Sequence, residues 1–236
     1  MCFSAVGSFT LAGVLGGIGV VSLARNTPRR LRMFAAIPLI FAVQQAAEGV
    51  VWLTIASPSQ ATLHRIAVNA FLGIALVIWP MWSPFALHRA EQDPRTRRVL
   101  FALFCSGVVV ATGAVVLLTW WQPVAVVAGH SICYNHEGAS EAPRQLVTLL
   151  PYLIPALVPY FVSTLKLART IGVTLVVSLF VTVIVEREAF TSVWCFFAAI
   201  LSVLMAMAVE REREVTPAPR GPWPRAREVK TASAGN

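Results

Sequence analysis

The residues with the clearest capacity for chemistry lie inside an apolar stretch. Glu48 sits within AIPLIFAVQQAAEGVVWL at residues 36–53, a run long enough to form most of a membrane-spanning helix. A charged group near the middle of such a helix costs roughly 2.5–3.5 kcal/mol on insertion scales, so Glu48 is expected to be protonated, paired or facing a wet cavity. Helical spacing puts Gln44, Glu48 and Trp52 on one stripe, with Gln45 beside Glu48.

This stripe has two interpretations. In the first it is a site for a proton, a cation or a polar ligand, in which Gln44 and Gln45 orient Glu48 and Trp52 forms a wall. Asn69 is predicted at similar depth in the next span and is expected to help close the pocket. In the second the same side chains form a hydrogen-bonded clamp between helices, since Gln and Glu join helices within membranes.

A second group of reactive side chains lies in the connection at residues 121–146. His130, Cys133 and His136 follow one another at three-residue intervals, and imidazole and thiolate are ligands for zinc or copper. Because this spacing is not an established structural zinc motif, a merely polar loop is the alternative. Cys2 is predicted on the same side of the membrane, where it is either a further metal ligand, a disulfide partner of Cys133 or an idle thiol.

The part of this connection that reads VAVVAGHSICY alternates apolar residues with small or polar ones. This pattern predicts a short hairpin or a re-entrant segment. Either form is expected to cover the outer end of the protein as a lid.

The composition of the chain indicates the type of fold that positions these side chains. The chain of 236 residues is 57% hydrophobic and 13% charged, which leaves too little polar surface to cover a soluble globule. We expect an all-α integral membrane fold at residues 1–209 and a disordered cytoplasmic tail at 210–236. Its seven predicted spans lie near residues 6–24, 33–56, 66–87, 99–120, 147–165, 170–186 and 189–209.

Charge gives the orientation of the seven-helix bundle. Threading the spans alternately places 16 of the 19 Lys and Arg residues on one side and leaves Arg65, Arg144 and Arg187 on the other. The positive-inside rule therefore predicts an outer N-terminus and a cytoplasmic C-terminus. The same distribution, in short loops beside apolar spans, disfavours nucleic acid as a partner despite the net charge of +8.

Two further features concern the spans themselves. The prolines of WPMWSP at residues 79–84 are predicted to free backbone carbonyls and bend the third span, as are those at 151, 155 and 159 in the fifth. Cys105 in the fourth span is expected to be a small buried hydrophobe.

Several enzyme classes are poorly supported. The last span has no Lys to hold retinal, and the four His residues lie in loops or at span ends, unlike those of zinc-dependent seven-helix hydrolases. The chain also contains no Walker motif, no GxSxG and no CxxCH.

Four segments carry a resemblance to known sequences: MCFSA at 1–5, IPLIFAVQQAAEGVVW at 37–52, WPMWSP at 79–84 and SVWCFFAAILS at 192–202. Through them the chain resembles an uncharacterised family of bacterial multi-span membrane proteins. The resemblance implies a location in the bacterial inner membrane but brings no activity with it. The positions that match its motifs are Cys2, Gln44, Gln45, Glu48, Trp52, Trp194 and Cys195, which favours the Glu48 stripe over the loop.

The sequence thus predicts a membrane protein that binds, senses or transports a small ligand, a metal ion or a proton through an outward-facing polar pocket around Glu48. Two alternatives remain. One is a membrane-embedded redox enzyme that depends on a metal or on thiols, and enzymatic function is the less favoured reading. The other is a structural or accessory subunit of a membrane complex.

Overall fold

The computed structural model describes residues 4–25, 27–120, 122–128, 131–136, 142–165 and 168–185, together with 197, 199, 201–204, 206–207 and 209–210. The side chains of 128, 135–136, 142–149 and 185 lie outside this description. Apart from Glu210, the predicted tail therefore falls outside the described residues, as does most of the seventh predicted span.

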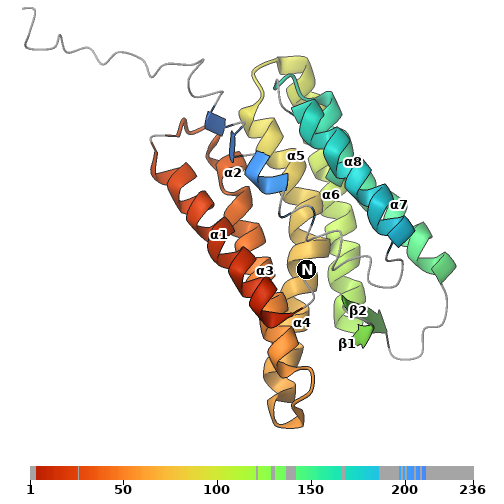
Figure 1. Ribbon diagram of the computed structural model, residues 1–236. Helices are drawn as coiled ribbons and strands as arrows, with labels where there is room; N and C mark the ends of the chain where they lie inside the picture. Colours follow the sequence, from red (N-terminus) through yellow and green to blue (C-terminus); the bar gives the residue numbers. More distant parts are fainter. Residues whose placement is uncertain are drawn as a thin grey trace, which may run out of the picture.

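The described chain is mostly helical, and its long helices stand side by side (Figure 1). The helical elements are α1 (Ala5–Ala24), α2 (Arg32–Ala35), α3 (Ile37–Thr54), η1 (Pro58–Gln60), α4 (Ala61–Gly73), η2 (Ile74–Ile78), α5 (Trp79–Ala90), α6 (Pro94–Trp120), α7 (Ala142–Val162) and α8 (Ala168–Val185).

Helix length and composition support the membrane prediction. Among the described residues four helical segments are long and apolar enough to cross a membrane: Ala5–Ala24, Arg32–Thr54, Pro58–Ala90 and Pro94–Trp120. Leu150–Val162 and Ala168–Ile184 are shorter apolar helices. The expected helical membrane architecture is confirmed at this level.

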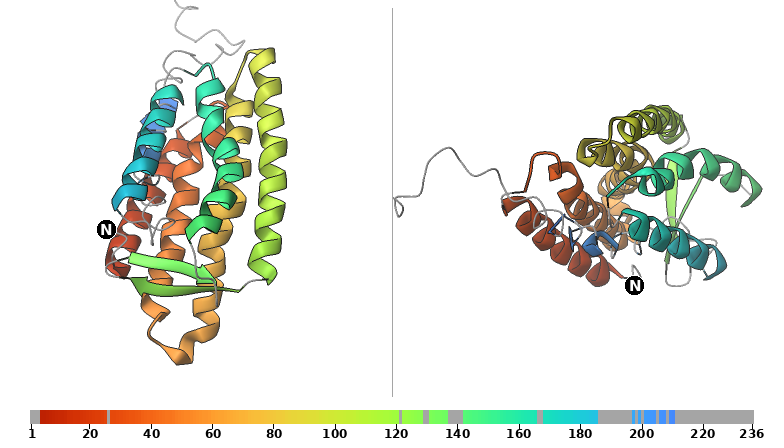
Figure 2. Two further views of the ribbon diagram at one scale, coloured as in Figure 1. Left: turned by 90° about the vertical axis from the view of Figure 1, so that its right-hand side faces the viewer. Right: turned by 90° about the horizontal axis from the view of Figure 1, so that it is seen from above.

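A two-stranded sheet adds to the helical fold and confirms the predicted hairpin. β1 (Pro123–Ala128) pairs antiparallel with β2 (Ser131–His136), and Val126 lies opposite Cys133. The hairpin crosses one end of the bundle, here called the hairpin end (Figure 2). It is anchored by Ile132, which is fully buried in a cluster with residues of α3 and α4, and by Tyr134, whose ring stacks on Phe71 with centroids 4.8 Å apart.

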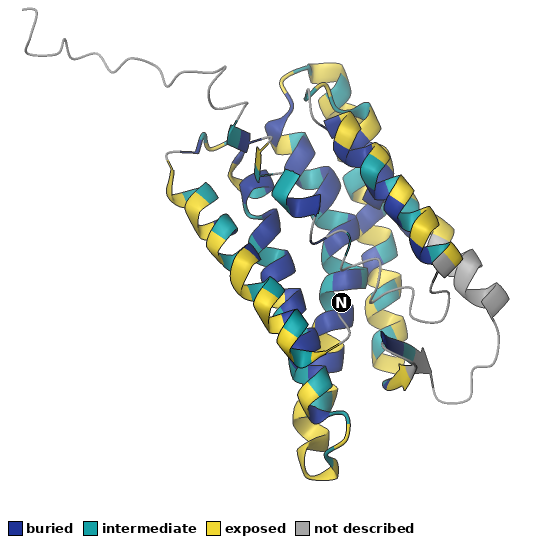
Figure 3. Ribbon diagram, in the orientation of Figure 1, coloured by how far each residue is buried: buried dark blue, intermediate teal, exposed yellow. Residues whose placement is uncertain are grey.

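The opposite end, here called the Glu91 end, holds the turn at residues 91–93 between α5 and α6 (Figure 1). The turns from α1 to α2 and from α7 to α8 lie at this end as well. Between the two ends, buried residues line the faces on which the helices meet, whereas α1 and α6 also present exposed faces (Figure 3).

Prolines interrupt the long helix from α4 to α5, as predicted. In η2, a π-helical turn, the Trp79 amide bonds to the Ile74 carbonyl five residues back. Pro80 follows and has no N–H to give to the carbonyl of Ala75. Tyr152 of α7 supplies the missing donor, since its hydroxyl lies 3.0 Å from the Ala75 oxygen.

A second carbonyl freed by proline brings α5 and α6 into close contact. The Pro80 carbonyl finds no donor four residues on, because residue 84 is also proline. This oxygen faces Gly107 of α6 so closely that a Cβ on Gly107 would lie 2.0 Å from it. Only glycine fits at this crossing.

The prediction that Cys105 is buried is wrong. Cys105 is exposed on α6, where the buried residues are Leu100, Gly107 and Ala111. α6 packs on α5 and α7 through that narrow face, so many of the other apolar side chains of this helix are exposed. An apolar span does not reveal from its composition which of its faces meets protein.

We predict that Gly107→Ala lowers the unfolding midpoint of the purified protein. The added methyl group forces α5 and α6 apart, and overpacking of this kind costs typically about 1–3 kcal/mol. Gly113→Ala on the same helix is the matched control, because its Cβ would meet nothing within 4 Å. Thermal unfolding of both variants in detergent measures the difference, and equal midpoints would contradict the close crossing.

Candidate functional site

The three polar residues singled out on α3 are completely buried. Gln44, Gln45 and Glu48 each expose none of their surface. α3 packs on α1 along one side and on α4 along another, and the three side chains fall on its protein-facing side. The structure therefore brings together, within little more than one helical turn, two amides and a carboxyl group.

Gln44 is held by a partner on another helix. The Trp79 indole N–H of α5 donates to Gln44 Oε1 at 2.7 Å, and the Trp79 ring stacks on Phe41 of α3 with centroids 4.0 Å apart. The other end of the same amide, Gln44 Nε2, is buried and has no hydrogen-bond partner among the described residues. The Oε1 atom of Gln44 thus joins α3 to α5, and its Nε2 group remains available as a hydrogen-bond donor.

Helix α1 closes the neighbouring side of α3. A Cβ on Gly49, the residue after Glu48, would lie 2.8 Å from the Phe9 ring of α1. Ser8, next to Phe9, is fully buried, and its hydroxyl has no hydrogen-bond partner within the part of the chain that the structure describes. The turn of α3 that carries Glu48 is therefore in direct contact with α1 on this side.

The two other predicted members of the pocket are less buried than this group. Asn69 is exposed on α4, and its amide nitrogen donates to the Arg65 carbonyl of its own helix at 2.8 Å. Trp52 is half-buried at the end of α3 nearer the hairpin. Of the five residues predicted to form the pocket, Gln44, Gln45 and Glu48 are the ones that are completely buried.

The predicted metal and disulfide residues fall mostly outside the described residues. Cys2 and His130 lie outside them, as does the side chain of His136. Cys133 is described and is buried in β2. The described residues include no group of three His, Cys, Asp or Glu side chains arranged to hold a metal ion. The zinc or copper site and the Cys2–Cys133 disulfide remain predictions.

Sequence reasoning missed Glu91, a second buried carboxylate. Glu91 is 5% exposed at the turn after α5. Its oxygens accept hydrogen bonds from the amides of Gln92 (2.9 Å) and Asp93 (3.2 Å) in its own turn. They also accept from the Ser163 hydroxyl (3.1 Å) and from the amide (2.7 Å) and hydroxyl of Thr164. One carboxylate therefore fastens the α5–α6 turn to the segment that follows α7.

The hydrogen bonds around Glu91 stabilise its charged form. Burial raises the pKa of Glu91, but the hydrogen bonds from Thr164, Asp93 and Gln92 outweigh it, so that the pKa lies below its ordinary value. Nearby, the Arg30 guanidinium donates to the Ala90 carbonyl at 3.3 Å and brings the α1–α2 turn to the same place. Glu91 is a structural fastening of the Glu91 end rather than an unsatisfied reactive group.

Sequence reasoning also missed Trp79 as the partner of Gln44. It treated WPMWSP only as a bent segment, whereas Trp79 donates to Gln44 and Trp82 donates to the Met33 carbonyl at 3.1 Å. A tryptophan beside a helix-interrupting proline was the available signal, because an irregular turn directs side chains away from the regular helical faces.

Comparison with known families gave one match. The model of a family described as Family of unknown function (DUF6629) matches residues 1–220. No curated protein and no solved structure gave a match.

We predict that Trp79→Phe destabilises the protein. The change keeps an aromatic ring against Phe41 but leaves Gln44 Oε1 without its donor, and an unsatisfied buried polar group costs about 1–3 kcal/mol. Trp120→Phe is the control, because Trp120 is 81% exposed. Unfolding midpoints in detergent measure the effect. If both variants unfold like the wild type, the Gln44–Trp79 bond does not stabilise the fold.

We also predict an acid-sensitive contribution from Glu91. Because its pKa is depressed in the folded protein, its stabilisation is complete above the ordinary value of 4.5 and is lost as the pH falls through the lower folded value. Glu91→Gln should therefore unfold more easily at neutral pH, and its difference from the wild type should shrink in acid. Gln92→Ala, at the exposed neighbouring position, is the control. A difference that is independent of pH would contradict this origin.

Proposed function

The chain belongs to the Family of unknown function (DUF6629), and we propose that it is an integral membrane protein that binds a cation or exchanges a proton at Glu48. The observation that carries the proposal is the complete burial of Gln44, Gln45 and Glu48 on one helix of membrane-spanning length. The two amides, one helical turn before the carboxyl group, provide oxygens for a cation and N–H groups for a charged carboxylate.

Energetics favour a functional role for this group. Burying an ionisable side chain in the middle of a membrane helix costs free energy. Such residues seldom face lipid and typically mark ion or proton pathways. A clamp between two helices needs only one good hydrogen bond, which Gln44 and Trp79 already form. Gln45 and Glu48 bring two further polar side chains into the same completely buried region, where each carries a desolvation cost.

The proposal includes an orientation. We propose seven spans in a bacterial inner membrane, with the hairpin end and the N-terminus outside and the tail at 210–236 in the cytoplasm. Most described arginines support it, because those at 25–32, 89–98 and 169 flank turns of the Glu91 end. Arg65 lies near the hairpin end. In this orientation His130, Cys133 and His136 would meet an external metal ion first.

A second function is favoured by one observation. The Trp79–Gln44 bond shows that at least part of the polar group acts as a clamp between α3 and α5. A structural subunit of a membrane complex would need no more than this. In that case Glu48→Gln should fold and behave like the wild type when the protein is studied alone.

We predict that proteoliposomes containing the protein conduct protons or cations through a route that requires Glu48. With a pH-sensitive dye trapped inside, an imposed pH or cation gradient should change the internal pH faster than in protein-free vesicles. Glu48→Gln keeps the shape of the side chain but removes its charge and its titration. It should lower the rate of internal pH change at least about tenfold, which corresponds to the loss of one interaction of about 1.4 kcal/mol. Asn69→Ala is the control, because Asn69 is exposed on the neighbouring helix.

Equal rates for a folded Glu48→Gln variant and the wild type would exclude conduction through Glu48 and favour the structural subunit. Elemental analysis of the same samples tests the metal. Stoichiometric metal that disappears in Glu48→Gln assigns it to α3. Metal lost instead in a variant with alanine at 130, 133 and 136 assigns it to the hairpin.

A further inference from the structure

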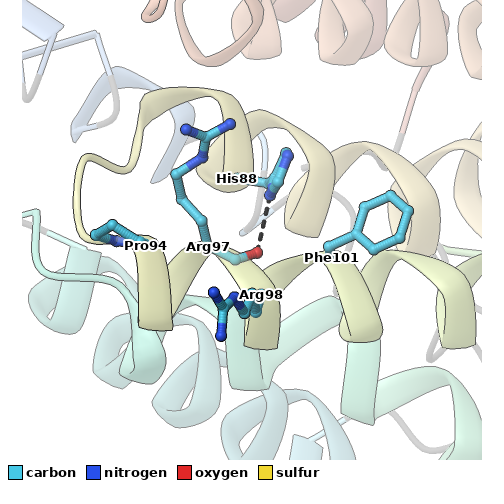
Figure 4. A pocket seen from close by; sticks show the side chains of 5 residues that line it. All are labelled: His88, Pro94, Arg97, Arg98 and Phe101. Carbon is cyan, nitrogen blue, oxygen red and sulfur yellow. Dashed lines mark hydrogen bonds between the residues drawn. The ribbon is translucent and has the colours of Figure 1, made fainter.

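A depression at the Glu91 end lies far from Glu48, at the opening of α6. It has a volume of about 290 Å³ and is lined by His88 of α5 and by Pro94, Arg97, Arg98 and Phe101 of α6 (Figure 4). Two of its five side chains carry guanidinium groups, one carries an imidazole and one a phenyl ring. The depression is independent of the function proposed for Glu48.

His88 is fixed in the wall of this depression. Its Nδ1 lies 2.9 Å from the Arg97 carbonyl oxygen (Figure 4). Because a carbonyl only accepts, Nδ1 carries the hydrogen and donates it, which leaves Nε2 as the second polar atom of the ring. The hydrogen bond holds the imidazole against the first turns of α6, where the two arginines begin.

Arg97 and Arg98 bring positive charge that the described residues do not neutralise. Both are exposed, and neither guanidinium group forms an ion pair within the described part of the chain. A guanidinium group presents its N–H donors in a planar fork that matches two oxygens of a phosphate. The depression is thus suited to a phosphate group that sits outside the chain.

An apolar surface continues from the phosphate-sized depression along α6. Phe101 is 51% exposed, its ring lies 5.7 Å from that of His88, and Phe104 lies 6.1 Å beyond it. From Arg97 onward, Phe101, Cys105 and Val109 recur every four residues and are all exposed, so that they form one stripe down the helix. The charge lies at the start of the stripe and is followed only by apolar or weakly polar side chains.

We propose that this site binds an anionic phospholipid. Its phosphate lies at the first turns of α6 beside His88 and Arg97, with Arg98 contributing positive charge from the other side of the helix (Figure 4), and one acyl chain follows the stripe from Phe101 to Val109. α6 is long and apolar enough to cross a membrane, which puts its first turns at the depth of lipid headgroups and the stripe among the acyl chains. A free phosphate ion would use the arginines but not the stripe, whereas a phospholipid uses both.

The test is native mass spectrometry of the full chain in a neutral detergent, titrated with dioleoylphosphatidylglycerol or dioleoylphosphatidylcholine. We expect the anionic lipid to bind more tightly. Arg97→Gln/Arg98→Gln should weaken its binding roughly 30-fold, since each arginine near a membrane surface contributes about 1 kcal/mol. Arg65→Gln, which removes an exposed arginine near the hairpin end, should leave binding unchanged. Equal binding of the two lipids, or equal loss in both variants, would overturn the proposal.

Two further measurements separate a lipid site from a simple anion site. Phe101→Ala leaves both arginines in place and should weaken phosphatidylglycerol binding, whereas inorganic phosphate added in excess should not displace the lipid. If phosphate displaces the lipid, or if Phe101→Ala binds it as well as the wild type, the site recognises the anion alone and the lipid proposal fails.

Discussion

The structure depends on one constraint, that polar groups within a membrane-type bundle must find partners inside the protein. The segment from η2 to α5 shows this most clearly, because two prolines remove backbone donors there. Tyr152 reaches the Ala75 carbonyl from α7, and Gly107 lets α6 approach the Pro80 carbonyl. The irregular helix thereby becomes the element on which α6 and α7 assemble.

The same segment controls the candidate site. The π-turn of η2 ends at Trp79, whose indole nitrogen donates to Gln44 across the interface with α3. This bond uses the oxygen of the Gln44 amide, and Gln45 and Glu48 are buried on the same helix. Burying a carboxyl group in a helix of membrane-spanning length is costly, and ionisable groups at such positions are typical of ion or proton sites. This cost is why we assign Glu48 a functional role.

The helical membrane architecture and the hairpin could be predicted from the sequence, because span length, apolar composition and the alternation in VAVVAGHSICY are local properties. The burial of Gln44, Gln45 and Glu48 followed as well, since lipid cannot satisfy these groups. Contacts between segments that are distant in the sequence could not be predicted. Glu91 meets Thr164 across 73 residues of sequence, and the exposure of Asn69 and Cys105 depends on how each helix is rotated in the bundle. Periodicity in uniformly apolar helices does not encode that rotation.

The most direct test of the central claim is infrared difference spectroscopy of the reconstituted protein, recorded between acidic and alkaline buffer. The carbonyl stretch of a protonated carboxyl group in an apolar environment is resolved from that of a carboxylate. If Glu48 exchanges its proton with solvent, or loses it when a cation binds, the carbonyl band of the wild type should change with pH or with added cation. The band should be missing in Glu48→Gln. A band that stays constant across all conditions, or one that persists unchanged in the variant, would contradict the account.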